Sequence, residues 1–147
     1  MRGYLRKASK EDMDLLFAWA NEPAVRRNSF STAEIAYDEH KRWFADLLQR
    51  KDSRQYIYMY DNEPIGQARI TVSGETAEIG YSICAEKRGM GHGKKLLQQL
   101  YKQVREDVPE VKKLIAKVKP DNIASQKAFR DAGYLEKYRA YEISLDK

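Results

Sequence analysis

The stretch whose spacing points most clearly to chemistry is RGMGHG, residues 88–93, in which Arg88 precedes three alternating glycines and a helical pattern follows. Glycine lowers helix stability and frees the backbone, so this arrangement carries a cost in free energy. Bare amides at the first turn of a helix bind anions, and the helix dipole favours negative charge there. Because Lys94 and Lys95 add positive charge, the stretch predicts a binding site for phosphate groups.

The spacing of these glycines separates the loop from two other phosphate-binding patterns. No Gly-Lys-[Ser/Thr] follows, so the loop is not a P-loop and ATP hydrolysis is not expected. The dinucleotide fingerprint G-x-G-x-x-G is also absent, since the glycines at 89, 91 and 93 alternate strictly.

Three strands are predicted to lead into this loop. The last, AEIGYSIC at 77–84, comes directly before it, and a helix is predicted after it at 94–107. Apolar side chains alternate with period two at 55–60 and 65–72, which predicts the two earlier strands. Only short turns join these three strands, so we expect an antiparallel meander.

The rest of the chain is predicted to complete one mixed sheet with helices on its faces. The other expected elements are strands at 3–8, 112–118 and 134–145, a helix with a capping box from Ser9 to Asp12, a loop at 21–30, a second helix with the capping signal Ser31 and Glu34, and a short helix that Asp121 or Asn122 caps and Gly133 ends. The order β-α-α-β-β-β-α-β-α-β predicts a mixed α/β (α+β) fold.

Length and composition limit the class of protein. With 147 residues, 42% apolar and 33% charged, the chain is expected to form a single domain, 1–147, in the cytoplasm. No apolar run approaches the roughly 20 residues that span a membrane, and the first residues lack the apolar part of a signal peptide. The single cysteine, Cys84, excludes an internal disulfide and a cysteine-rich zinc site. The net charge of +5 favours an anionic partner such as a nucleotide, a phosphorylated cofactor or nucleic acid.

The loop between its strand and its long helix resembles the pyrophosphate-binding motif R-x-x-G-x-G of the GCN5-related N-acetyltransferases (GNAT). EIGYSI before the loop, and KPDNIASQKAFRDAGY at 119–134 with its Asn-x-x-Ser segment, resemble the same family, and the likeness covers about residues 3–145. It implies a central, mostly antiparallel mixed sheet of six to seven strands with about four helices. It also implies direct transfer of an acetyl group from acetyl-CoA, as co-substrate, to a primary amine, without a metal.

The resemblance implies two cofactor-binding segments. Backbone groups of Ile83 and Ala85 are expected to pair with the pantetheine arm in the manner of an added strand. Asn122 and Ser125 are expected to face the same arm, although a plain helix cap is an alternative role for Asn122. The amides expected to bind the pyrophosphate are those of Arg88, Gly89, Met90, Gly91, His92, Gly93 and Lys94.

Amide formation needs a base for the amine, a donor for the oxyanion and an acid for the departing thiolate. By resemblance Glu78 is the candidate base, directly or through water; an exposed strand carboxylate is the alternative. In a regular strand Glu78 and Tyr81 face opposite sides, so we expect a bulge at Gly80 to bring both to one substrate. A backbone amide of this strand is expected to bind the oxyanion.

The acid is where the chain departs from the family. Many relatives carry tyrosine seven residues after the asparagine, and here that position is Phe129, which cannot donate a proton. Ser125 is the expected replacement, and departure of the thiolate without a dedicated acid is the alternative.

The acceptor site is expected between the first two helices. Residues 19–44, with the pattern W-x-N…V-R…S…I…E-H-x-x-W-F, resemble acetyltransferases of nucleotide-linked amino sugars, nearest to the type that acetylates the 4-amino group of a UDP-linked sugar on the way to pseudaminic acid. Arg26 and Arg27 are expected to bind the diphosphate, with His40 and Tyr81 lining the acceptor site. A solvated arginine pair and a core histidine are the alternatives.

Other functions stay open at this point. A protein N-terminal or small-amine acetyltransferase, similar to the ribosomal-protein acetyltransferases, would favour an acidic acceptor groove. A basic nucleic-acid-binding module would need a stripe of basic and aromatic residues, whereas the basic residues here gather at the glycine loop and are otherwise scattered. We therefore expect a small-molecule amine as partner, no membrane and no nucleic acid, and leave a homodimer open.

Overall fold

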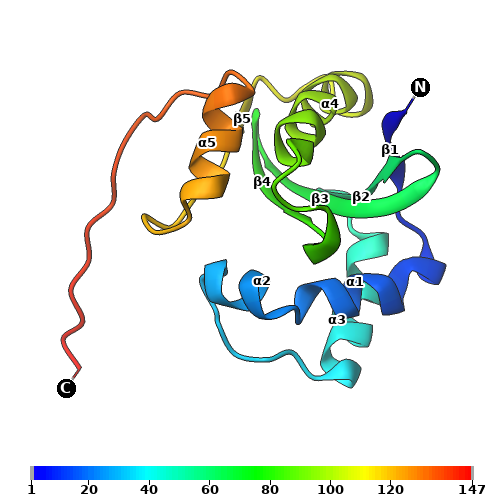
Figure 1. Cartoon of the computed structure of the whole chain (residues 1–147), viewed down its shortest axis with the longest axis horizontal. Coiled ribbons are helices and arrows are strands. Elements are labelled where there is room, and N and C mark those ends of the chain that lie inside the picture. Colours follow the sequence, from blue (N-terminus) through cyan, green and yellow to red (C-terminus); the bar gives the residue numbers. More distant parts are fainter. Residues whose placement is uncertain (1, 147) are drawn as a thin grey trace.

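The computed structural model describes residues 2–146, which form a five-stranded sheet with helices on both faces (Figure 1). In chain order the elements are β1 (Gly3–Lys7), η1 (Lys10–Asp12), α1 (Met13–Ala20), α2 (Pro23–Asn28), α3 (Tyr37–Gln49), β2 (Ser53–Tyr60), β3 (Glu63–Ser73), β4 (Thr76–Ile83), η2 (Ala85–Lys87), α4 (His92–Asp107), β5 (Lys113–Ile115) and α5 (Ile123–Asp131). The strand order is β1-β2-β3-β4-β5, antiparallel except for the parallel pair β4–β5. The predicted mixed α/β class and the predicted meander are both confirmed.

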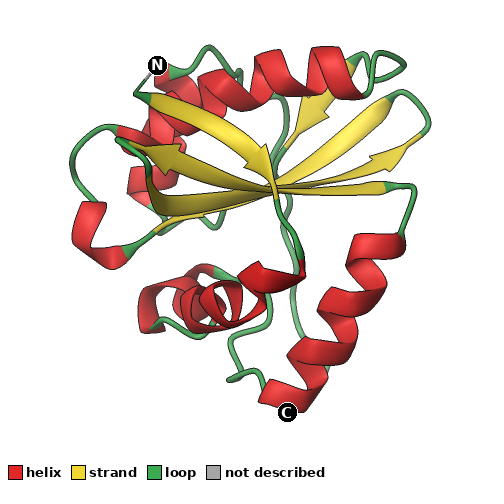
Figure 2. Ribbon diagram, turned by 90° about the vertical axis from the view of Figure 1, so that its right-hand side faces the viewer, coloured by secondary structure: helices red, strands yellow, loops and turns green. Residues whose placement is uncertain are grey.

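The sheet separates two helical layers, each of which covers a hydrophobic core of different size (Figures 1 and 2). Helices α4 and α5 cover one face over the larger core, in which Leu96, Leu97 and Leu100 of α4 are fully buried. Helices α1 to α3 lie against the other face over a smaller core that includes Leu16 and Phe44. Since burying a leucine side chain contributes roughly 1.5–3 kcal/mol, α4 is the helix most firmly anchored to the sheet.

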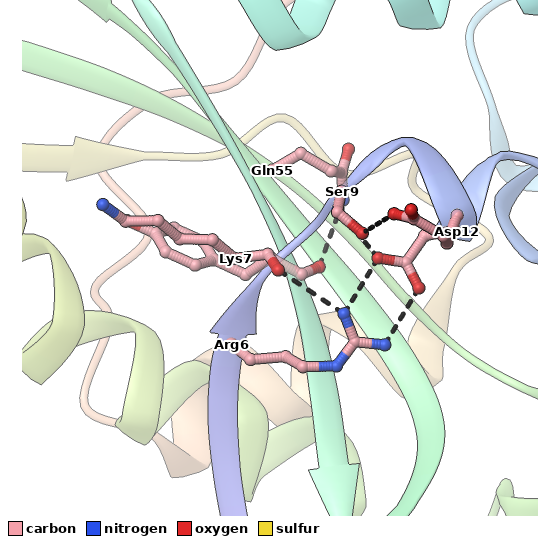
Figure 3. A network of polar contacts seen from close by, with 7 residues as sticks. Arg6, Lys7, Ser9, Asp12 and Gln55 are labelled. Atoms are coloured by element: carbon pink, nitrogen blue, oxygen red, sulfur yellow. Dashed lines mark hydrogen bonds and ion pairs between the residues drawn. The ribbon is translucent and has the colours of Figure 1, made fainter.

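The chain enters its first helices through a polar network (Figure 3). The Ser9 amide donates to Asp12 at 2.9 Å, so the predicted capping interaction is present. Arg6 donates to both Asp12 carboxylate oxygens, at 2.8 and 2.9 Å. The guanidinium beside it holds the pKa of the Asp12 carboxyl below its usual value. This network fixes how β1 leads into α1.

Several predicted helix boundaries differ from the structure. The predicted loop 21–30 contains α2, because the Glu22 side chain caps it by accepting from the Val25 amide at 3.1 Å and Pro23 suits the first turn. The next helix starts at Tyr37 after Ala36, not at the expected signal near Ser31. Helix α4 begins at His92, two residues earlier than predicted.

The expected six to seven strands and four helices are corrected to five strands and five α-helices over the described residues. The predicted strand 134–145 is absent: residues 135–146 form neither helix nor strand and run away from the body of the molecule (Figure 1). Its alternating apolar side chains, such as Tyr141 and Ile143, are more than four-fifths exposed because no other part of residues 2–146 packs against them. Strand β5 is also shorter than the predicted 112–118.

Candidate active site

The site is built around a gap between β4 and β5. The two strands pair at three positions, the last joining Glu78 to Ile115, and then β5 ends while β4 continues to Ile83. The far half of β4 therefore has an edge without a partner strand among the described residues. Such an edge presents backbone donors and acceptors to a ligand.

The pairing of β4 with β3 decides which backbone groups face this gap. The Cys84 amide donates to the Ile65 carbonyl at 2.8 Å, and hydrogen-bonded pairs alternate along an antiparallel ladder. The backbone groups of Tyr81 and Ile83 consequently point away from β3, toward the gap. The Ile83 carbonyl already accepts from Arg88 Nε at 3.0 Å, so at that residue the amide is the group left for a ligand.

The predicted bulge at Gly80 is absent. The β3–β4 register runs without a shift from Gly66–Ile83 to Ser73–Thr76, so the pleat of β4 is regular. Glu78 therefore lies on the face of α1 to α3, and Tyr81 lies on the face of α4 and α5. Because the gap beyond Glu78 is open to both faces, a molecule in it can meet both side chains without a bulge.

The glycine loop has two different reasons for its glycines. Gly89 and Gly91 have φ values of 78° and 81°, in the left-handed region, and a Cβ on either would meet no atom within 4 Å. Glycine is needed at 89 and 91 for the backbone conformation and not for lack of room. The space before α4 is open. At Gly93 a Cβ would lie 3.4 Å from that of Ala128 and 3.6 Å from the Tyr81 ring, so this glycine permits close packing of α4.

The side chains of Arg88 and His92 are directed away from the loop. Arg88 donates to the Glu22 carboxylate at 2.8 Å, which ties the loop to the first turn of α2. His92 is buried, with its ring centroid 4.6 Å from that of Tyr60, and burial lowers its pKa. The Arg88 amide donates to the Ala85 carbonyl at 3.4 Å, so the prediction that it binds the pyrophosphate is not supported and the amides left for an anion begin at Gly89. The exposed Lys94 side chain lines the cleft.

Helix α5 brings a second set of groups to the gap. Asn122 caps it, with Oδ1 accepting from the Ser125 amide at 3.3 Å, so the predicted cap is present. The Ser125 hydroxyl lies 3.0 Å from that of Tyr81, and Phe129 packs edge-on against the Tyr81 ring. Burial raises the pKa of Tyr81, so its hydroxyl remains protonated at neutral pH. Tyr81 therefore belongs to the α4–α5 side and not to the acceptor helices.

The arginines expected to bind a diphosphate have other contacts. Arg26 donates to the carbonyls of Ala20, Ser31 and Ala33 and to the Ser29 hydroxyl, at 2.7 to 3.3 Å. These bonds hold the loop after α2 and leave little capacity for a ligand. Arg27 is exposed and does not line the cleft, and its carbonyl accepts from a lysine side chain at 3.1 Å.

His40 lies at the base of the acceptor side. It is buried against the rings of Phe17, Trp43 and Phe44, and burial lowers its pKa, which leaves it neutral at pH 7. Its Nε2 has no hydrogen-bond partner among residues 2–146. Glu78 and His40, both predicted as site residues, therefore line one cleft on the same side of the sheet.

A cleft of about 1170 Å³ joins these parts. It is lined by most of the predicted residues; Arg27, Ala85 and Met90 are outside its lining. Two contacts connect the helices of the acceptor side to the cofactor side. Arg88 bonds to Glu22. Lys119 bonds to the Arg27 carbonyl and lies over the Phe30 ring. Across residues 2–146 there is no cluster of three or more potential metal-ligating side chains, and no helix is long and apolar enough to cross a membrane.

Sequence reasoning missed a polar row on the acceptor face of the sheet. Gln55 donates to Gln67 at 2.8 Å, Gln67 donates to the Ser82 hydroxyl at 3.1 Å, and Arg69 lies beside them. The signal was present in QARIT, where Gln67, Arg69 and Thr71 alternate with apolar residues on a central strand. Polar side chains on a strand covered by helices indicate a cavity, because packed positions there are apolar.

Comparison with known proteins agrees with this geometry. The family model for the acetyltransferase (GNAT) domain matches residues 2–135. The acetyltransferase PseH of Campylobacter jejuni is 23% identical over 123 residues, 83% of this chain and 76% of its own length.

Two solved structures share the fold. The aminoglycoside acetyltransferase AAC(6')-Ib, solved with paromomycin and acetyl-CoA, is 22% identical, with a TM-score of 0.82 over 93% of this chain and 85% of its own. RimL, a ribosomal alpha-N-protein acetyltransferase solved with coenzyme A, is 20% identical, with a TM-score of 0.77 over 90% of this chain and 80% of its own.

Proposed function

The chain belongs to the GNAT acetyltransferase family and is an acetyl-CoA-dependent N-acetyltransferase, and we propose that its acceptor is the amine of a nucleotide-linked amino sugar. The observation that carries the proposed mechanism is the gap beside β4, with Glu78 on one face and the Tyr81–Ser125 pair on the other. A thioester in that gap meets an acceptor from the Glu78 side and a proton donor from the opposite side.

The cofactor is proposed to bind along the loop and the open edge of β4. The amides from Gly89 to Lys94, at the start of α4, would bind its pyrophosphate, with the positive end of the helix dipole behind them. The amides of Tyr81 and Ile83 would pair with the pantetheine arm. Asn122 would face that arm with its free NH₂ group, since its oxygen is used in the cap.

Glu78 is proposed as the general base, directly or through one water. It takes a proton from the ammonium form of the acceptor, and the neutral nitrogen then attacks the thioester carbonyl carbon. A backbone amide at the gap would stabilise the oxyanion. Lys117 Nζ lies 3.9 Å from the Glu78 carboxylate, and both side chains line the cleft.

Tyr81 and Ser125 are proposed to supply the proton for the thiolate when the C–S bond breaks. Position 129 is phenylalanine, and its ring packs against the ring of Tyr81. The Tyr81 hydroxyl lies 3.0 Å from that of Ser125, which is on α5 with Phe129. The tyrosine donates the proton, and the serine hydroxyl orients it. Phenol is the better acid of the two, because its pKa lies nearer that of a thiol.

Two lines support a nucleotide-linked sugar as acceptor: the similarity to PseH and the resemblance of residues 19–44 to enzymes of that class. A protein N-terminal or small-amine acceptor is the second candidate. It is favoured by the carboxylates of Glu39 and Glu78, both of which line the cleft and would attract a cationic amine.

Thiol release with saturating acetyl-CoA tests the acceptor. We expect the highest kcat/KM with a UDP-linked 4-amino-4-deoxyhexose, against spermidine, paromomycin and a short peptide with a free N-terminus. A peptide or polyamine turned over more than tenfold faster would overturn the sugar proposal and favour the second candidate. Release with none of them would contradict both acceptor classes.

A further inference from the structure

Arg69 lies in the wall of the acceptor side and has no counterion among residues 2–146. It lies on β3, the central strand, opposite Gln55 of β2 and Gly80 of β4. Its guanidinium is 4.9 Å from the centroid of the Trp43 ring, which holds it by a cation–π contact. Both side chains line the cleft.

The lack of an anion sets Arg69 apart from other arginines that contact acidic side chains. Arg2, Arg6, Arg50 and Arg88 donate to carboxylates at 2.8 to 2.9 Å. Arg69 makes no hydrogen bond or ion pair with any side chain of residues 2–146. Burial and the nearby Arg50 charge lower its pKa, as expected for a cation that has lost water and gained no partner.

The surroundings of Arg69 leave room for a ligand beside it. A Cβ on Gly80, the residue directly opposite, would meet no atom within 4 Å. Glu78 and Ser82 lie on the same face, one step to either side along β4. Because neighbouring strands are about 4.8 Å apart, an anion on Arg69 would lie roughly 5–10 Å from the gap.

We propose that Arg69 determines acceptor specificity by binding a phosphate or carboxylate that the acceptor carries a few bonds from its reacting amine. The inference rests on the proposed function, and it deepens it, because it adds a required anionic group to the amine. A guanidinium held in place by a ring binds such planar or tetrahedral anions through two parallel hydrogen bonds. Acceptors that are purely cationic leave this half-buried charge unpaired.

Matched acceptors test the proposal. The first pair is the UDP-linked 4-amino-4-deoxyhexose and its methyl glycoside, which share the amine and differ in the diphosphate. The second pair is a tripeptide with a free or an amidated carboxyl end, which separates a carboxylate source from a phosphate source. Each is assayed with wild type, Arg69→Gln and Arg69→Lys. The control is Arg54→Gln, which removes the same charge from the same sheet outside the cleft.

For the preferred anionic acceptor, Arg69→Gln should raise KM by ten- to a hundredfold with kcat changed less than threefold. Its uncharged partner should be unaffected, and Arg69→Lys should recover part of the loss. The KM for acetyl-CoA and the melting temperature should match those of Arg54→Gln. Equal changes for the anionic and the uncharged partner, or no change for either, would overturn the role of Arg69.

A binding measurement separates this proposal from the choice of acceptor. With the cofactor site saturated by coenzyme A, calorimetry should detect UDP or inorganic pyrophosphate binding to wild type, at least tenfold weaker in Arg69→Gln. That result would support Arg69 even if no tested amine were acetylated, in which case only the proposed acceptor fails. Unchanged affinity in Arg69→Gln, or no binding to wild type, would overturn the inference.

Discussion

The two sides of the cleft are built in different ways. The cofactor side consists mainly of backbone groups, namely the amides at the start of α4 and the open edge of β4, with glycines at 89 and 91 in left-handed conformations. The acceptor side consists of side chains from β2, β3, β4 and the helices α1 to α3, which are distant in sequence. A backbone site leaves a local pattern of glycines and a helix start, whereas a side-chain site depends on strand register and helix packing.

If this contrast is right, the largest effect comes from a change to the cofactor backbone. Gly91→Glu places a side chain and a negative charge where the pyrophosphate would bind, and we expect coenzyme A affinity to fall on the order of a hundredfold, about 2.8 kcal/mol. Gly74→Glu is the control, because Gly74 also has a positive φ of 63° and open space, but lies in the β3–β4 turn. Calorimetry showing equal affinity in both variants would remove the loop from the cofactor site.

A change on the acceptor face should leave the cofactor untouched. Glu78→Gln removes the proposed base, so kcat should fall by about 10²–10⁴-fold while coenzyme A affinity stays within twofold. Glu75→Gln makes the same change on the exposed turn before β4 and should have no effect on either quantity. A fall in kcat below threefold at neutral pH would make Glu78 an ordinary surface carboxylate.

The Tyr81–Ser125 pair tests whether the two sides meet at the gap. Tyr81→Phe should lower kcat by about ten- to a hundredfold, or roughly 1.4–2.8 kcal/mol of barrier, and Ser125→Ala should lower it less. If the tyrosine is the donor and the serine only orients it, the double variant should be no slower than Tyr81→Phe alone. In that double variant Phe129→Tyr, four residues from Ser125 on the same helical face, should restore part of the rate. Wild-type kcat in Tyr81→Phe would mean that the thiolate leaves by another route.

The smallest expected effect is on stability and concerns one histidine from each side. His40 and His92 are buried with lowered pKa values, so below pH about 6.5 the unfolded chain binds more protons than the folded one. The free energy of unfolding should therefore fall between pH 7.5 and pH 5.5. In urea titrations His40→Gln and His92→Gln should each show a shallower fall than wild type. A slope unchanged in both would contradict the lowered pKa values.

The contrast also explains what could be predicted from the sequence. The cap at Asn122, the start of the glycine loop and the meander depend on residues within a few positions of one another, and all three are present. Helix α2 was missed because glutamate is an uncommon cap, and Glu22 acquires a second role through Arg88, which is 66 residues away. Arg69 was missed because its importance depends on Trp43 and Gly80, which only folding brings beside it.

The C-terminal segment shows the opposite error. Residues 134–145 have the alternation of a strand, and yet Leu135, Tyr138 and Leu145 are exposed. A period of two predicts a strand only where an edge and an apolar surface are available to pair with it, and within one chain this segment uses neither. The alternation of apolar residues does not show whether such an edge and surface are available.

The most direct test of the account is a crystal structure of the protein with coenzyme A. The account predicts the pyrophosphate on the amides of residues 89–94, the pantetheine arm along the open edge of β4, and the sulfur in the gap beside β5. The sulfur should lie within hydrogen-bonding reach of the Tyr81 hydroxyl, with Glu78 on the opposite face. Coenzyme A bound elsewhere, or a sulfur that only one face of the sheet can approach, would contradict it.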